Sequence, residues 1–139
     1  MVRCLAAAAV IWSAGCLSAE DHAATPMFLS LSEGNWNTAT LDFADPAGSC
    51  TGAMSVHADP VGDHYSLGGF WECAAILNSS FTLSGAVTGT EMAAGSVRIL
   101  FNSTGYQPVV VDAIVSGDEI HGTANGSGYA AAMFSAKRQ

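Results

Sequence analysis

Basic residues are scarce in this chain of 139 residues, which has four Lys or Arg against twelve Asp or Glu and a net charge of −8 at pH 7. Proteins that bind nucleic acids neutralise phosphates with clustered Lys and Arg, so this composition argues against a nucleic-acid partner. It argues equally against attraction to anionic lipid through a basic patch. Large apolar side chains are also few, because much of the hydrophobic half of the sequence is alanine. We therefore expect one domain whose core is thin or leaves a cavity.

After the N-terminal segment, no stretch of the sequence shows the spacing of apolar residues that is typical of a helix. From Asn35 onward the sequence alternates between apolar and polar residues and is punctuated by turn residues, which is typical of an antiparallel meander. We predict an all-β fold of eight antiparallel strands in up-and-down order, which close into a small barrel that is flattened because few bulky residues fill it. An open twisted sheet, a flattened sandwich and a transmembrane barrel are the alternatives. The predicted strands span residues 35–44, 49–59, 64–74, 79–87, 92–101, 109–115, 120–124 and 129–137.

The N-terminal segment has the features of an export signal. Arg3 precedes the short apolar stretch CLAAAAVIW, and small residues follow it. A buried core helix is the alternative interpretation. The stretch WSAGC loosely matches a bacterial lipobox, so lipidation of Cys16 competes with cleavage after Ala19. We expect a signal peptide over 1–19, a polar lead-in over 20–33 and the β-barrel over 34–139. The protein is then exported, and it is periplasmic, anchored to the outer membrane by lipid or secreted, with no transmembrane span in its mature form.

Cysteines are few, and one pair is placed symmetrically about a turn. With Pro60–Asp63 as a four-residue hairpin loop, Cys50 falls directly opposite Cys73. Opposed residues of antiparallel strands lie close enough for a disulfide to form with little strain. Processing removes Cys4, and it removes Cys16 or lipidates it, so two cysteines remain in an oxidising compartment. We predict a Cys50–Cys73 disulfide; two reduced, buried thiols are the alternative.

An internal repeat places three glycines at similar intervals, in PVGDHYSLGGF, VTGTEMAAGSV and VSGDEIHGTA. We interpret each as a hairpin turn, because glycine suits the positive φ that such turns require. The second repeat is one residue longer than the third, and a β-bulge at Ala93-Ala94 would keep its apolar side chains on one face. The same reasoning sets Arg98 opposite Asp112 as a cross-strand ion pair. The predicted loops are Pro60–Asp63, Thr88–Glu91 and Ser116–Glu119.

Several segments together resemble small exported bacterial β-barrel domains of the calycin-like sort. The matching segments are Trp36 to Phe43, SCTGAM, WEC, VSGDEIHGT and GYAAAMFSAKR. This resemblance implies a β-barrel in the cell envelope but no particular activity. The tail FSAKRQ is also similar to the barrel lobes of transferrin-binding-protein-like surface lipoproteins, although the aromatic-Gly-Pro motif usual before that tail is missing. The second resemblance would imply binding to a host or nutrient protein.

Residues that could carry chemistry are few. His57 and His64 lie near one turn with Asp59 and Asp63, and such a group could bind a metal. Turns also favour Asp for local hydrogen bonds, so a solvated hairpin tip is the simpler interpretation. His121 has no cysteine or serine nucleophile motif nearby, and no pair of carboxylates is predicted to face inward. We therefore expect no metal, no cofactor and no enzyme activity.

Two groups of residues suggest binding instead. Tyr65, Trp71 and Tyr129 are predicted to face inward, where they either form core or line a pocket at the barrel mouth. Leu100, Val110 and Ile114 are predicted to face outward on neighbouring strands, where they form an interface or are exposed by chance. We expect a non-catalytic envelope protein that acts as a protein-interaction or inhibitor-type module. A calycin-type barrel for a small apolar ligand is the alternative, and an enzyme of unknown class is the third possibility.

Overall fold

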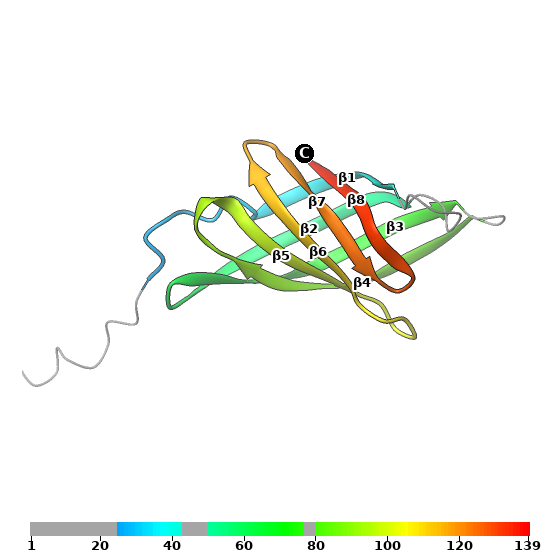
Figure 1. Cartoon of the computed structure of the whole chain (residues 1–139), viewed down its shortest axis with the longest axis horizontal. Coiled ribbons are helices and arrows are strands. Elements are labelled where there is room, and N and C mark those ends of the chain that lie inside the picture. Colours follow the sequence, from blue (N-terminus) through cyan, green and yellow to red (C-terminus); the bar gives the residue numbers. More distant parts are fainter. Residues whose placement is uncertain (1–24, 43–49, 77–79) are drawn as a thin grey trace, which may run out of the picture.

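Eight antiparallel strands form a closed barrel in chain order, as predicted (Figure 1). The computed structural model describes residues 25–42, 50–76 and 80–139. Strand β1 pairs with both β2 and β8, so the first and last strands close the barrel. The strands are β1 Gly34–Asp42, β2 Cys50–Val61, β3 His64–Ile76, β4 Ser80–Glu91, β5 Ser96–Asn102, β6 Val109–Ser116, β7 Glu119–Gly126 and β8 Tyr129–Arg138, with a 3-10 turn, η2, at Ala93–Gly95.

The barrel interior is packed with apolar side chains. Burial alternates along β5 and β6, as expected for strands with one face toward a core and one toward water. The ring of Phe101 contacts Trp71 edge-on at 5.4 Å between centroids and lies 5.7 Å from the ring of Phe134. Aromatic pairs of this kind add to the free energy gained by burial. Other buried residues of the core are Trp36, Met54, Val56, Leu67, Cys73, Val87, Val97, Ile99, Val111, Val115, Ile120, Ala124, Ala132 and Ala136.

Two of the predicted registers are confirmed. Strand β6 pairs with β7 so that Val115 faces Ile120 across the Gly117-Asp118 turn. Strand β5 pairs with β6 so that Arg98 faces Asp112. The guanidinium of Arg98 binds both carboxylate oxygens of Asp112, with N–O distances of 2.7 and 3.1 Å.

The predicted β2–β3 register is wrong by two residues. The turn contains only Gly62 and Asp63, because Gly62 takes a φ of 62° that allows a two-residue hairpin. Cys73 therefore lies opposite Gly52, and Cys50 lies opposite Ala75. A shift of two keeps each residue of the pattern on its predicted face, so the alternation of apolar and polar residues is the same in both registers. The side chain of Cys50 lies outside the described part of the chain, and the Cys50–Cys73 disulfide stays a prediction.

The predicted hairpin loop at Thr88–Glu91 is also wrong. Strand β4 continues through these residues to Glu91, which pairs with Val97. Ala93 and Ala94 do not form the predicted bulge but belong to the β4–β5 connection, where Ala94 has a φ of 61°. The connection is closed by a hydrogen bond of 2.8 Å from the Met92 N–H to the Ser96 carbonyl.

The face that points inward changes along β8. Ala131 and Met133 are exposed, whereas Ala132 and Phe134 are buried. The β7–β8 register shifts after Ala124, which moves the following side chains to the other face.

Candidate functional site

The described part of the predicted lead-in, residues 25–33, lies across one end of the barrel, at the left in Figure 1. The Tyr65 hydroxyl donates a hydrogen bond of 2.8 Å to the Phe28 carbonyl, and the two rings meet edge-on with centroids 5.3 Å apart. The sequence predicted only a polar segment without a clear period here. The structure shows that residues 25–33, which we call the strap, cover the barrel mouth and contact β3, β4 and β8 there.

A buried carboxylate holds the strap. Glu91, at the end of β4, is fully buried. It accepts hydrogen bonds from the hydroxyls of Ser30 and Ser32, at 2.6 and 2.5 Å. It also accepts them from the backbone N–H groups of Leu31 and Ser32, at 2.7 and 3.3 Å. A buried carboxylate is costly unless its oxygens are hydrogen-bonded, and four donors meet that requirement here.

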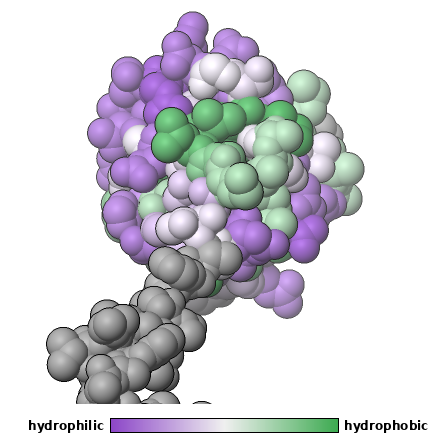
Figure 2. All heavy atoms as spheres, turned by 90° about the vertical axis from the view of Figure 1, so that its left-hand side faces the viewer, coloured by the Kyte–Doolittle hydropathy of each residue, from purple (hydrophilic) through white to green (hydrophobic). Residues whose placement is uncertain are grey.

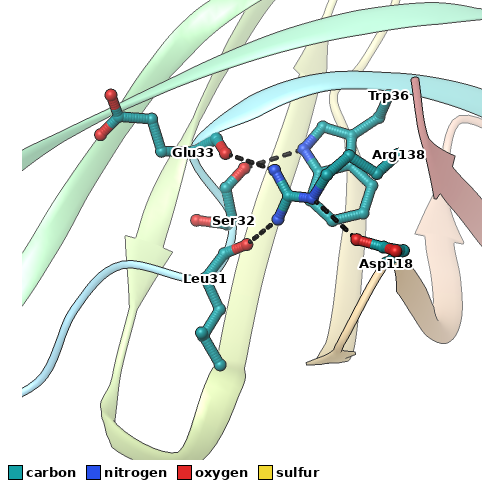
Figure 3. Close-up of polar contacts among 6 residues, drawn as sticks. All are labelled: Leu31, Ser32, Glu33, Trp36, Asp118 and Arg138. Carbon is teal, nitrogen blue, oxygen red and sulfur yellow. Dashed lines mark hydrogen bonds and ion pairs between the residues drawn. The ribbon is translucent and has the colours of Figure 1, made fainter.

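A second anchor is Arg138, near the end of β8 (Figure 3). Its guanidinium donates to the carbonyls of Glu33 and Leu31, at 2.8 and 2.7 Å. It lies over the Trp36 ring, 4.2 Å from the centroid, and its Nε is 3.4 Å from a carboxylate oxygen of Asp118. One planar cation thus joins the strap, β1 and the β6–β7 turn, a geometry suited to arginine.

Local backbone chemistry supports this arrangement. The indole N–H of Trp36 donates to the Ser32 carbonyl at 2.8 Å, which fixes the chain just before β1. Gly34 has a φ of 136°, and a Cβ at this position would collide with the guanidinium of Arg138. A glycine is therefore required where the strap turns into the first strand.

The three residues predicted to face inward do not form one pocket. Trp71 is buried in the core, where its indole N–H donates to the Asn102 carbonyl at 3.2 Å. Tyr65 is half-buried under the strap, whereas Tyr129 begins β8 at the other end of the barrel (Figure 1). Burial raises the pKa of the Tyr129 hydroxyl above its ordinary value. Trp71 therefore has a core role, and the two tyrosines sit at opposite mouths.

The predicted outer patch is divided by an ion pair. Leu100 lies opposite Val110, and Ile114 lies farther along β6 opposite Ser96. The Arg98–Asp112 pair stands between them on the same face, so Ile114 is separated from the other two. The hydrogen bond from Arg98 lowers the pKa of Asp112, and the pKa of Arg98 is raised by the same contact.

Two exposed aromatic residues extend the patch toward the other barrel end, and the sequence prediction missed them. Phe70 on β3 pairs with Ala86 on β4, and Ala86 pairs with Asn102 on β5. Asn102 lies two positions after Leu100, which faces Val110. Tyr106 is exposed in the β5–β6 loop. An open depression of about 360 Å³ includes Tyr106 and Ala86, the residue that pairs with Phe70. It is lined by Gly85, Ala86, Asn102, Ser103, Thr104 and Tyr106. We call Phe70, Leu100, Tyr106 and Val110, with this depression, the wall surface.

The histidines form separate local pairs. His57 contacts Asp59 at 3.0 Å and His64 contacts Asp63 at 3.1 Å, both at the exposed β2–β3 tip. The hydrogen bond from His64 lowers the pKa of Asp63. Within residues 25–42, 50–76 and 80–139, no group of three or more His, Cys, Asp or Glu side chains could hold a metal ion. Cys16, the candidate lipidation residue, lies outside these ranges.

Comparisons with other proteins identify no relative. No protein-family model, no curated protein and no solved structure matches this chain. In the described ranges, no helix is long and apolar enough to cross a membrane.

Proposed function

We propose that this chain is a non-catalytic binding module of the bacterial envelope that recognises another protein through the wall surface. The observation that carries the proposal is the contrast between the inside and the outside of the barrel. Trp71, Phe101 and Phe134 pack against one another in the interior. Because these side chains fill the interior, we assign partner binding to the outer face of the barrel, unlike in barrels that enclose their ligand.

The wall surface has the composition of a protein interface. Phe70 and Tyr106 are exposed aromatic residues, and aromatic side chains are enriched where proteins bind one another. Leu100 and Val110 are directly opposed and half-buried, so they supply an apolar centre. The Arg98–Asp112 pair and Asn102 supply a polar rim. The calycin-like resemblance and the N-terminal export signal support a location in the cell envelope.

A small ligand is the second candidate, and the depression favours it. Its volume of about 360 Å³ lies at the lower end of the range for ligand pockets. It is open to solvent, and beside Tyr106 it is lined by Gly85, Ala86 and the polar residues Asn102, Ser103 and Thr104. A ligand held there would be bound on the outer wall rather than in the lumen.

Native mass spectrometry of the protein purified from its own envelope tests both candidates. A stoichiometric complex with a second polypeptide supports the protein-recognition proposal. The substitution Leu100→Asp should abolish that complex, whereas Met133→Asp, on β8, which pairs with neither β5 nor β6, should leave it intact. A retained small molecule that is lost in Tyr106→Ala would favour the ligand candidate. A complex that both aspartate variants retain would contradict the assignment to the wall surface.

A further inference from the structure

The strap reverses the usual placement of polar and apolar residues. Its side chains alternate between the barrel and the solvent, but Ser30 and Ser32 face the barrel. The outward positions hold Met27, Leu29 and Leu31, all exposed. Met27 is fully exposed, and 83% of Leu29 is accessible to solvent. A surface segment that contacts only water would be expected to carry polar side chains at these positions.

Neighbouring elements add to this apolar end. Met92 follows the anchor Glu91 and is exposed, as is Val61 at the β2–β3 tip. The strap, that tip and the β4–β5 connection share one end of the barrel (Figure 1). Figure 2 looks onto this end and shows apolar residues gathered near its centre, with polar residues around them. We call Met27, Leu29, Leu31, Val61 and Met92 the apolar end.

We propose that the apolar end docks onto the surface of a zwitterionic lipid bilayer, with Met27 and Leu29 inserted among the lipid chains. The inference is independent of partner recognition, because the wall surface extends toward the other end of the barrel. Long, unbranched or flexible side chains that project fully from a surface suit insertion into lipid better than a flat protein contact. The five residues of the apolar end are uncharged, and the nearby Arg138 and His64 are paired with Asp118 and Asp63. The net charge of −8 should therefore repel anionic lipid.

The chain that precedes the strap supports lipid as the occupant. It carries the candidate lipidation residue Cys16. Met27 follows Cys16 by eleven positions, so even a fully extended connection would hold it within about 36–40 Å of a lipid on that cysteine. Tethering makes docking an intramolecular step, for which a few apolar side chains suffice.

Methionine oxidation can test the proposal without altering the protein, because the chain carries its own controls. Met27 and Met92 report on the apolar end, and Met133, 71% exposed on β8, reports on the distant wall. Met54 is 2% exposed and reports on the fold. The protein purified from its own envelope is floated with saturated phosphatidylcholine vesicles, treated with hydrogen peroxide and digested. Mass spectrometry then gives the oxidation rate at each methionine, with the vesicle-free protein as reference.

We expect vesicles to slow oxidation of Met27 and Met92 about fivefold or more and to leave Met133 unchanged, because sulfoxide formation follows exposure. Vesicles containing phosphatidylglycerol should protect less. In the variant Leu29→Ser, Val61→Ser, protection of Met92 should be lost, whereas the matched variant Phe70→Ser, Ile114→Ser should retain it. Slow oxidation of Met54 in both variants shows that the barrel is intact.

Three results would overturn the proposal. The protein fails to float, or Met27 and Met92 oxidise on vesicles as fast as they do in buffer. Alternatively, protection in buffer alone rises with protein concentration, in which case a second copy of the chain covers the apolar end.

Discussion

Replacing Glu91 by alanine should loosen the strap around Ser30–Ser32 while the barrel remains folded. The substitution removes the acceptor of all four hydrogen bonds described for this carboxylate. The strap contributes no strand to the barrel, whose ladder of eight strands is complete without it. We therefore expect a local opening, of the kind in which one weakly held segment separates from a stable core.

The magnitude follows from the number and type of the lost bonds. A hydrogen bond to a charged group contributes about 1.5–3 kcal/mol, so four give an upper limit of about 6–12 kcal/mol. The actual loss is smaller, because the loosened strap lets water satisfy its donors. Arg138, Tyr65 and Trp36 would still hold the strap through four hydrogen bonds to its carbonyls. We expect the free energy of unfolding to fall by about 2–4 kcal/mol, the size typical of breaking a buried hydrogen-bond network.

Hydrogen exchange and chemical denaturation measure the two parts of this prediction. In Glu91→Ala the amides of Leu31 and Ser32 should exchange much faster, while the amides of Val111 and Ile120 in the barrel keep their protection. Glu91→Gln is the matched control, because it keeps the size and one acceptor oxygen and should give an intermediate effect. Unchanged protection of Leu31 and Ser32 in Glu91→Ala would refute the reasoning, and so would complete loss of the fold.

Three other expectations can be checked separately. Trp71→Ala should lower the free energy of unfolding by about 3–5 kcal/mol, measured by denaturant titration, because it leaves a cavity beside Phe101; an unchanged midpoint would contradict the core role. Because the pKa of Asp112 is lowered, its pair with Arg98 stabilises the fold above about pH 4 and is lost as the pH falls through the folded value. In Arg98→Gln, NMR titration should show the Asp112 pKa rising, and a constant value would argue against the pairing. The Cys50–Cys73 disulfide should leave neither thiol open to alkylation before reduction, and reduction should cost about 2–4 kcal/mol; mass spectrometry that finds both alkylated in the native protein would disprove it.

Alternation and turn residues predicted the fold and part of its register. The β6–β7 register was predicted correctly because the assumed loop, Ser116–Glu119, is centred on the actual turn at Gly117-Asp118, so Val115 still faces Ile120. Between β2 and β3 the same argument failed, because a shift of two residues leaves every side chain on its own face. The apolar pattern therefore cannot distinguish the two registers, and the two-residue turn at Gly62 decides between them.

Glu91 was misplaced for a different reason. Gly89 resembled the turn glycines of the other repeats, so Glu91 was assigned to a loop. Its actual partners lie 59–61 positions earlier in the chain, in the strap. Local patterns contain no information on such a distant contact. A signal was nevertheless present, because Met27, Leu29 and Leu31 alternate with Phe28, Ser30 and Ser32 in an otherwise irregular segment.

The hydrogen bonds between Arg138 and the strap have a consequence for the rate of folding. These two hydrogen bonds join positions that are 105 and 107 residues apart. The β1–β8 ladder, which closes the barrel, spans a comparable separation. Contacts over such distances form slowly, because the entropy of closing a long loop is lost before any contact compensates for it. Until β8 arrives, β1 and β7 each present an unpaired edge to other chains. The period of greatest exposure to aggregation therefore lasts until the final strand docks, and a factor that shields these two edges would raise the yield of folded protein.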